Sequence, residues 1–465
     1  MRNTSGERRT TKDERRNTFS RFLVLFLVLF VALYFYKLGS TGLIDVDEPR
    51  YAETGREMLE SGNFIVPYFN YEVRYDKPIF FYWLEAASMS IFGVNEFAAR
   101  LPSALSGLLC TFMVFLFVRT FYPLYCALLS VLILLSTLEF AALSRFSITD
   151  MSLCAFESGA IICFFLGCNY HVTSGRFFKQ QVKNINFWYI LGFLFLSFAF
   201  LTKGPVAILI CGLVLIPFFW WIEKLDYFFK SYSFYVGLCL FLLLTFPWYV
   251  LVHLATNGEF TKIFFGMHNF SRYTSVVSGH KGSVFYFIPV VLIGFLPWTF
   301  FLVQSVSFIL KKGLKSLLKS QREQIPWFCL WWFIIVFLFF SVSKTKLLTY
   351  ILPLFPALSV ILAVWFHHVF EEKSNLKDLV VGLGVFFLFS LITFYLCITN
   401  LSVFLPREVK GLNLDILIII FAFILLVGVS MAWTASNKNP PLMFLIILGM
   451  QCILYFSLIT FLLLA

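Results

Sequence analysis

Charged residues are scarce in this chain of 465 residues. Asp, Glu, Lys and Arg make up 13% of it, against roughly 25% in soluble domains. Hydrophobic residues make up 60%, and the mean hydropathy is +0.85. This composition excludes a soluble globular protein and a disordered chain. All ten cysteines fall within predicted membrane spans and none is paired in a loop, which argues against a disulfide framework or a cysteine zinc site.

Three common catalytic motifs are missing from the sequence. It contains no GxxxxGK[ST], no HExxH and no CxxC. ATP hydrolysis, zinc proteolysis and thiol redox chemistry therefore have no support. An enzyme without a nucleotide site that works at the outer membrane face must take its substrate from the membrane, and a lipid-linked donor meets this requirement.

Long apolar runs recur from residue 22 to the end of the chain. Runs of about 18 residues cross the hydrocarbon core as helices, and these runs lack the alternation of a β-barrel. We predict an all-α polytopic membrane protein with about 13 spans. The predicted spans are 22–39, 97–118, 123–143, 150–170, 187–202, 205–222, 231–253, 283–309, 326–342, 347–366, 379–400, 414–433 and 441–464.

The distribution of Lys and Arg predicts which side each loop faces. Residues 1–21 form a basic tail, which places the N-terminus in the cytoplasm. With this start, the cytoplasmic segments hold about 21 of the 36 Lys and Arg but only about 9 of the 25 acids. This sorting explains most of the net charge of +11, so no nucleic-acid partner is needed. We expect a multi-pass membrane protein.

Residues 22–465 are predicted to form one membrane-embedded domain, with no soluble domain after the last span. Two outer loops stand out, the first at 41–96 and the second at 254–282. Residues 79–93 are apolar but contain Glu85 and many aromatics. We predict an interfacial helix there, because a further span would move the basic 310–325 loop to the outer side.

The unusual ionisable residues gather on the predicted outer side, which makes this face a candidate site. They include Asp47, Glu48, Arg50, Asp76, Lys77, Arg145, Asp150, Lys203, His268, Arg272 and the Ser343–Tyr350 segment. A carboxylate here is suited to orient or deprotonate an acceptor hydroxyl. Arg, Lys and Tyr side chains together are suited to bind a lipid phosphate.

Each of these residues also has a structural alternative. Asp47 and Glu48 before Pro49 are suited to begin a helix. Asp150 has Arg145 as an alternative ion-pair partner. Lys203 precedes Gly-Pro and is suited to cap a helix C-terminus. His268 and Arg272 share a face if their segment is helical, where a lone histidine is more often structural. Lys77 before Pro78 is suited to snorkel to the interface.

Several motifs in order together resemble one family. They are Asp47-Glu48-Pro49-Arg50-Tyr51-Ala52-Glu53, Asp76-Lys77-Pro78, Ala99-Arg100-Leu101-Pro102, Leu201-Thr202-Lys203-Gly204-Pro205 and Lys346-Leu347-Leu348-Thr349-Tyr350. The sequence resembles the aminoarabinose transferases of lipid A. Together with the protein O-mannosyltransferases, these belong to the GT-C glycosyltransferases. The resemblance covers residues 41 to about 365 and implies the GT-C transmembrane fold.

The resemblance also implies site roles. Asp47 corresponds to the family's catalytic aspartate and Asp150 to its second important aspartate, and with Glu48 beside the first they are the three candidate catalytic residues. Lys77, Arg272, Tyr350, Lys203 and Arg50 are candidates for binding the donor phosphate. Asp76 and His268 are candidate ligands of a divalent metal, zinc, magnesium or manganese. Two departures stand out, since Asp76 replaces the family's usual Glu and Met267 replaces the acid before the histidine.

The resemblance implies transfer of a sugar from a polyprenyl-phosphate donor at the periplasmic face of the cell inner membrane, and we predict that the transfer proceeds with inversion. The acceptor implied by the resemblance is lipid A or a related glycolipid. A protein Ser or Thr hydroxyl is the alternative acceptor. A lipid or solute transporter is the alternative from another class, although transporters usually carry internal repeats and polar groups near the midplane.

Overall fold

The structure is a computed structural model that describes residues 4–44, 46–169, 186–274, 282–372, 376–399, 414–436 and 439–461. Parts of the basic tail, the predicted 171–186 loop and the second outer loop lie outside these ranges. The helices are α1 (Thr4–Phe35), α2 (Asp47–Ser61), α3 (Phe80–Phe92), α4 (Glu96–Phe121), α5 (Leu124–Leu135), α6 (Leu138–Leu143), α7 (Thr149–Cys168), α9 (Phe187–Lys203), α10 (Val206–Trp221), α11 (Leu225–Lys230), α12 (Tyr232–Ala255), α13 (Glu259–Ile263), α14 (Arg272–Thr274), α15 (Phe287–Gly294), α16 (Leu302–Lys312), α17 (Gln321–Val342), α18 (Phe355–Glu372), α19 (Leu376–Thr399), α20 (Leu414–Ser436) and α21 (Pro440–Phe461).

Shorter elements complete the described structure. They are the two-stranded antiparallel hairpin of β1 (Tyr68–Phe69) and β2 (Glu72–Val73), the π-helix η1 (Phe264–Ser271) and the 3-10 helices η2 (Trp298–Phe301), η3 (Leu314–Leu318) and η4 (Leu348–Leu354). The hairpin lies in the predicted first outer loop, and η1 lies in the predicted second one.

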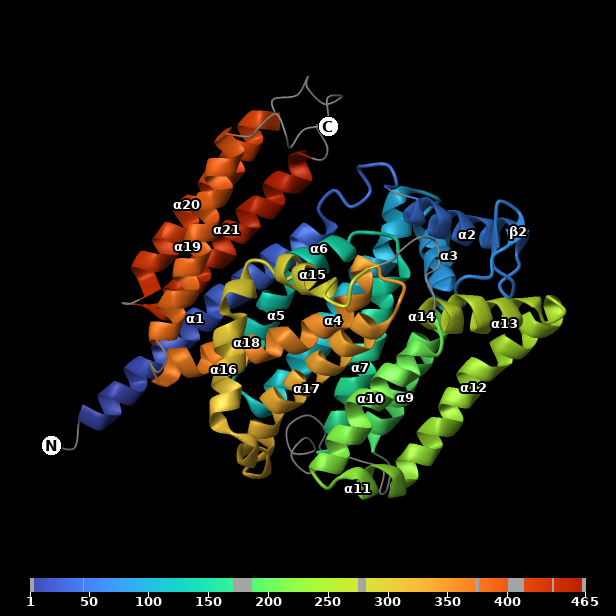
Figure 1. Cartoon of the computed structure of the whole chain (residues 1–465), viewed down its shortest axis with the longest axis horizontal. Coiled ribbons are helices and arrows are strands. Elements are labelled where there is room, and N and C mark those ends of the chain that lie inside the picture. Colours follow the sequence, from blue (N-terminus) through green and yellow to red (C-terminus); the bar gives the residue numbers. More distant parts are fainter. Residues whose placement is uncertain are drawn as a thin grey trace.

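The chain forms a helical bundle, as the apolar runs predict (Figure 1). Among the described residues, eight helices are long and apolar enough to cross a membrane. Four shorter apolar helices, Leu124–Leu135, Phe187–Lys203, Val206–Trp221 and Ala422–Ser436, occur at other predicted spans. The predicted class of fold is confirmed, but the count of about 13 spans is not.

The predicted span at 283–309 is not one straight helix. It consists of α15 and a second segment, Trp298–Lys312, which is bent from α15 by 105°. The break occurs at Phe295-Leu296-Pro297, where proline removes a main-chain donor and disfavours a continuous helix. A window that measures only mean hydropathy does not detect such a bend.

Helix α7 lies at the centre of the bundle, and its most apolar 18-residue stretch is 100% buried. It packs closely against α9, because small residues let the two backbones approach. A Cβ at Gly167 would lie 2.5 Å from the Tyr189 ring, and one at Gly192 would lie 2.9 Å from the Phe164 ring. Close packing through small residues is the usual way in which helices associate in membranes. The N-terminal end of α7, which carries Asp150, is thereby held in a fixed place.

The predicted outer loop forms a small layer over one end of the bundle. Figure 1 shows α2, α3 and β2 together at one corner, next to α13. An aromatic cluster joins this layer to the bundle, and it includes Tyr51, Tyr82, Trp248, Tyr249 and Phe260. The segment predicted as an interfacial helix at 79–93 is a helix, α3, and is not among the candidate spans; its place at the membrane interface stays a prediction. This layer positions the residues of the site described next.

Candidate active site

A cavity of about 520 Å³ lies beside the N-terminal ends of α7 and α10 and the C-terminal end of α9. Its polar lining is Asp76, Lys77, Lys203, His268, Tyr273, Ser343 and Tyr350, and its apolar lining is Leu153, Pro205, Val206, Leu209, Leu213, Phe264, Phe265, Phe339 and Phe340. The structure thus brings together five of the residues that the sequence nominated, from segments that are far apart in the chain. A polar floor with an aliphatic and aromatic wall is the lining that a phosphate attached to a lipid tail requires.

The best-defined ion pair of this region joins α9 to α7. Lys203 Nζ donates to Asp150 Oδ1 at 2.6 Å, and both side chains are largely buried. The same ammonium group lies 4.8 Å from the centre of the Tyr350 ring. Asp150 therefore pairs with Lys203 and not with Arg145, which donates to main-chain carbonyls instead. The structural alternative that joined Asp150 to Arg145 is wrong, because tertiary packing brings α9 to the start of α7.

Asp76 lies in the segment that follows the hairpin, and Arg74 holds it. Arg74 Nε and Nη2 donate to the two Asp76 oxygens at 2.6 and 3.1 Å. Burial raises the pKa of Asp76, but the hydrogen bond from Arg74 and the charges of Lys77 and Arg74 outweigh burial and lower this pKa below its ordinary value. Asp76 is therefore an anion at every physiological pH.

Arg74 is held in turn by α2 and α3. Its Nη1 donates to the carbonyl of Arg50 at 2.6 Å, and the guanidinium lies 4.6 Å from the centre of the Tyr51 ring and 5.5 Å from that of Tyr82. Sequence reasoning missed Arg74. A signal was present, because residues two apart in an extended segment point to the same side, which places Arg74 beside Asp76.

Positive charge exceeds negative charge in this region. Two carboxylates, Asp76 and Asp150, face three cations, Arg74, Lys77 and Lys203. Lys77 is 8% exposed and contributes to the electrostatic environment of both carboxylates. A low-dielectric pocket with excess cations favours an anion such as a phosphate.

Asp47 begins α2 and is exposed. It lies one helical turn before Tyr51, so the two residues share a face of α2. The ring of Tyr51 in turn covers Arg74, but Asp47 itself does not line the cavity. Arg50 is also exposed on α2 and does not line the cavity.

Glu48, next to Asp47, is buried and fully bonded. Its two oxygens accept from Arg100 Nε at 3.0 Å and Arg100 Nη2 at 2.9 Å, and from the backbone amides of Ile44 and Ser147, each at 2.7 Å. Four donors on one carboxylate join the loop before α2, helix α4 and the loop before α7. This arrangement fixes the start of α2, and with it Asp47.

His268 lines the cavity from η1. The second outer loop is thus helical at this point, but as a π-helix, a form that often occurs at functional sites. Arg272 begins α14, and its side chain lies outside the described part of the structure. Its predicted contact with the donor phosphate therefore stays a prediction. The sequence analysis also did not single out Tyr273, which follows Arg272 and lines the cavity.

The predicted metal site was compared with the donors that are present. Within the described ranges, no group of three or more His, Cys, Asp or Glu side chains is arranged to hold a metal ion. Both oxygens of Asp76 are engaged by a guanidinium, which occupies the positions that a metal ligand would offer. These residues do not fit a divalent metal at Asp76 and His268, and no step below uses one.

Solved structures with the same fold define the class of protein. The crystal structure of ArnT from Cupriavidus metallidurans bound to undecaprenyl phosphate matches with a TM-score of 0.79 and 24% identity, over 95% of this chain and 77% of that chain. The chain thus has the multi-span GT-C fold that the motifs predicted.

Sequence relatives define the family. The model of the family "Dolichyl-phosphate-mannose-protein mannosyltransferase" matches residues 19–260. The chain is also similar to proteins named undecaprenyl phosphate-alpha-4-amino-4-deoxy-L-arabinose arabinosyl transferase. The one from Shewanella sediminis is 33% identical over 77% of this chain and 62% of the relative. The one from Aeromonas salmonicida is 30% identical over 90% of this chain and 74% of the relative. The chain belongs to this family of membrane glycosyltransferases. It spans about three fifths of the length of the first curated relatives that it matches.

Proposed function

We propose that this protein is a glycosyltransferase that takes a sugar from a polyprenyl-phosphate donor and transfers it to lipid A or a related glycolipid. One observation carries the proposal. The cavity joins an apolar wall to a floor with more cations than carboxylates, and it is lined by Lys77, Lys203 and Tyr350. This combination suits a lipid phosphate, and the names of the arabinosyl transferase relatives supply the class of donor.

The donor phosphate binds at the floor of the cavity. Lys77 and Lys203 offer ammonium donors, the Tyr350 hydroxyl adds a neutral donor, and Arg272 is the further predicted contact. Arg74 and Asp150 keep these groups in place through the pairs already described. The first isoprene units lie along the wall of Phe264, Leu209 and their neighbours.

Transfer is a displacement at the anomeric carbon. The acceptor oxygen forms the new bond to this carbon while the bond from the anomeric carbon to the phosphate oxygen breaks, and the electron pair leaves with the polyprenyl phosphate. Fixed cations stabilise the charge that develops on the leaving phosphate. Asp47 orients the acceptor from the opposite face, and with a hydroxyl acceptor it also takes the proton. Attack opposite the leaving group inverts the configuration.

Glu48 acts as a positioning residue in this scheme. All four of its contacts are internal to the protein, so its carboxylate has no capacity left for a substrate. Its role is to hold the start of α2 so that Asp47 faces the acceptor.

The reaction takes place at the periplasmic face of the inner membrane, with the N-terminus in the cytoplasm. Support for this orientation comes from the basic tail and from the Lys311, Lys312 and Lys315 cluster, which share the predicted cytoplasmic side. The candidate site belongs to the loops of the opposite side.

Mass spectrometry of lipid A and membrane glycolipids tests the proposal. Three strains are compared: one with the intact gene, one with the gene deleted, and one carrying Asp47→Asn. We expect a fixed sugar mass to disappear in the last two, with the variant made at normal level, because loss of the group that positions the acceptor costs about 10²-fold in rate, and up to about 10⁴-fold where it also takes the proton. Glu60→Gln is the control, since Glu60 is an exposed acid on the same helix.

Two outcomes contradict parts of the proposal. Normal transfer by Asp47→Asn removes Asp47 from the chemistry. Unchanged glycolipids in the deletion strain, together with a sugar lost from a membrane protein, replace the glycolipid acceptor with a Ser or Thr hydroxyl, the acceptor class that the family model describes.

A further inference from the structure

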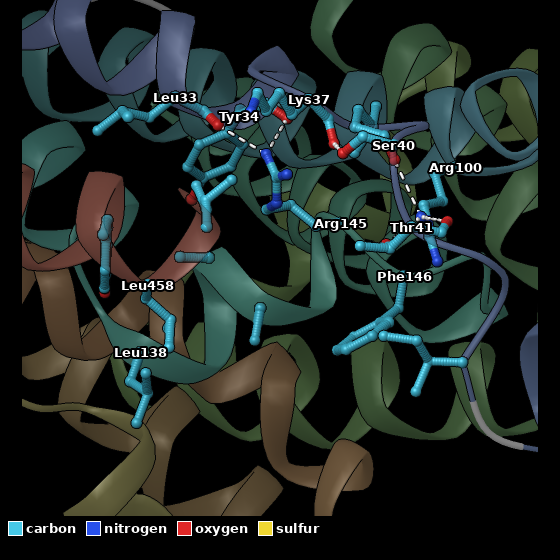
Figure 2. A pocket seen from close by; sticks show the side chains of 16 residues that line it. Leu33, Tyr34, Lys37, Ser40, Thr41, Arg100, Leu138, Arg145, Phe146 and Leu458 are labelled. Carbon is cyan, nitrogen blue, oxygen red and sulfur yellow. Dashed lines mark hydrogen bonds between the residues drawn. The ribbon is translucent and has the colours of Figure 1, made fainter. Parts of the chain in front are cut away.

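A second cavity, of about 240 Å³, lies between α1, α6 and α21, away from the donor cavity. Figure 2 shows Tyr34, Lys37 and Arg145 together at one end of its lining and Leu138 and Leu458 at the other. Of the ionisable residues that the sequence placed in the candidate site, Arg145 lines this cavity, and none of the residues assigned to catalysis, donor phosphate or metal does. Its volume is below the roughly 300–1,000 Å³ of sites that enclose a whole small molecule. It is thus large enough for one hydrocarbon chain and too small for a glycolipid headgroup.

The apolar end of this cavity is open to the membrane. Leu138 and Leu458 are 36% and 38% exposed, and α1 and α21 are both candidate spans. A gap between two spans that is lined by leucines gives access from lipid. An acyl chain is therefore the occupant that the apolar end favours.

The other end of the cavity is cationic. Arg145 donates to the carbonyls of Leu33, Tyr34 and Tyr36 at 2.7, 2.9 and 2.9 Å. Over the ranges that the structure describes, no ion pair joins Arg145 or Lys37 to a carboxylate. The lining contains no acidic residue. Two cations that pair with no carboxylate among the described residues, at the mouth of an apolar cavity, are complementary to an anionic lipid headgroup.

The cavity shares its wall with the segment that holds Asp47. Ile44 lines the cavity, and its backbone amide donates to Glu48 at 2.7 Å. Arg100 also lines the cavity and binds the same carboxylate (Figure 2 shows its bond to Thr41). Asp47 follows Ile44 by three residues in the sequence. A lipid held here has its headgroup next to the start of α2.

We propose that this second cavity binds one acyl chain of the acceptor, a phosphorylated glycolipid, with Lys37 and Arg145 next to a phosphate of its headgroup. The inference rests on the proposed function, because it assigns the acceptor's place. The donor thus approaches Asp47 from the cavity at α9 and α10, and the acceptor approaches from the opposite side, at α1 and α21.

The test separates acceptor binding from sugar transfer. The full chain in nanodiscs is photolabelled with lipid A that carries a diazirine in an acyl chain, and the labelled peptides are identified by mass spectrometry. We expect label on peptides that contain Ala142, Phe146 or Leu458. Ala142→Phe fills the cavity and should reduce this label by about tenfold, the scale on which an apolar pocket discriminates size. Ala32→Phe is the matched control, since Ala32 is exposed on α1 and does not line the cavity.

A second variant tests the headgroup without risk to the core. Lys37 is exposed, so Lys37→Ala should leave folding intact. It should weaken labelling by diphosphorylated lipid A by about fivefold, the upper range for an exposed ion pair, and labelling by dephosphorylated lipid A much less. In the transfer assay, both variants should raise KM for lipid A and leave KM for the donor within about twofold.

Two results overturn the inference. One is unchanged labelling in Ala142→Phe. The other is competition by phosphatidylglycerol that equals competition by lipid A at the same acyl concentration, which would indicate a general site for anionic lipids. The labelling assay needs no sugar donor, so it tests lipid binding separately from transfer. If the proposed function fails but this inference holds, Ala142→Phe still reduces the label while no sugar is transferred to lipid A.

Discussion

Arg74 changes the chemistry expected of the acid beside it. The residue types at Asp76 and His268 are those of a metal site, but Arg74 occupies both Asp76 oxygens. A guanidinium in a bidentate pair supplies fixed positive charge at the place where a divalent ion would supply it. On the proposed function, the positive charge beside the leaving phosphate comes from Arg74, Lys77 and Lys203.

Removal of divalent metal tests this interpretation. We expect transfer by the purified protein to continue at an unchanged rate after treatment with EDTA, because Arg74, Lys77 and Lys203 carry the charge. Arg74→Met should instead reduce the rate strongly, and added zinc or magnesium should not restore it. A loss of activity with EDTA that zinc reverses would show that a metal is required.

Glu48 and Arg100 form a buried pair, with side chains 2% and 4% exposed. Removal of one partner leaves an uncompensated charge, at a cost of about 3–5 kcal/mol. We expect Glu48→Gln to lower the thermal unfolding midpoint by several degrees and to reduce transfer as well. Thermal unfolding in detergent measures the first effect. The control is Glu60→Gln, which removes an exposed pair with Arg56 and should have little effect. An unchanged midpoint for Glu48→Gln would contradict the positioning role.

Helix α3 carries a buried acid that makes stability depend on pH. Burial raises the pKa of Glu85 well above its ordinary value of 4.5, more than the hydrogen bond from Ser147 and the charge of Arg74 lower it. The folded state therefore keeps a proton that the unfolded state loses. The contribution of Glu85 to the free energy of unfolding is fully present below about pH 4.5. It decreases as the pH rises, by at most about 1.4 kcal/mol per pH unit.

The variant Glu85→Gln isolates this contribution, since the amide resembles the neutral acid. We expect the wild-type unfolding midpoint to fall between pH 5 and pH 8 by more than that of Glu85→Gln. Thermal unfolding of both proteins at the two pH values is the measurement. Equal slopes would mean that Glu85 is ionised in the folded protein.

The elements were largely predictable because each has a local cause. Asp47 and Pro49 predicted the start of α2, and the apolar run with Glu85 predicted α3. Lys203 before Gly204 predicted the end of α9, where Gly204 has a φ of 81° that suits glycine. The bend at 295–297 was not predicted, because mean hydropathy carries no information about the direction of the helix axis.

The site was predictable only in part, because its pairs are set by tertiary structure. The motifs identified Asp76, Lys77, Lys203, His268 and Tyr350, which the fold brings to one cavity. The motifs did not identify which residues form ion pairs with each other. Glu48 meets Arg100 across 52 positions, and Lys203 meets Asp150 across 53. No spacing rule joins residues so far apart, so the positioning role of Glu48 and the choice of Lys203 over Arg145 required the structure.

For the molecule as a whole, the proposed function depends on its orientation in the membrane. Single cysteines at Glu60, on α2, and at Lys315, in η3, report the two sides, and both positions are exposed. With a membrane-impermeant maleimide, we expect Glu60→Cys to react in intact spheroplasts and Lys315→Cys to react only after permeabilisation. The wild-type chain controls for its own ten cysteines. The reverse pattern would move the site to the cytoplasm.

The size of the donor cavity limits how much of the proposed donor the protein can recognise. At about 520 Å³ the cavity is comparable to sites for single drug-sized ligands, which on the proposed function leaves room for a phosphate and the first isoprene units, with the rest of the polyprenyl tail among the lipids. We therefore expect carriers of different length to be interchangeable, and the protein to work in a foreign bacterial host whose carrier lipid has another chain length. Short, water-soluble analogues should likewise replace the natural donor in the test tube.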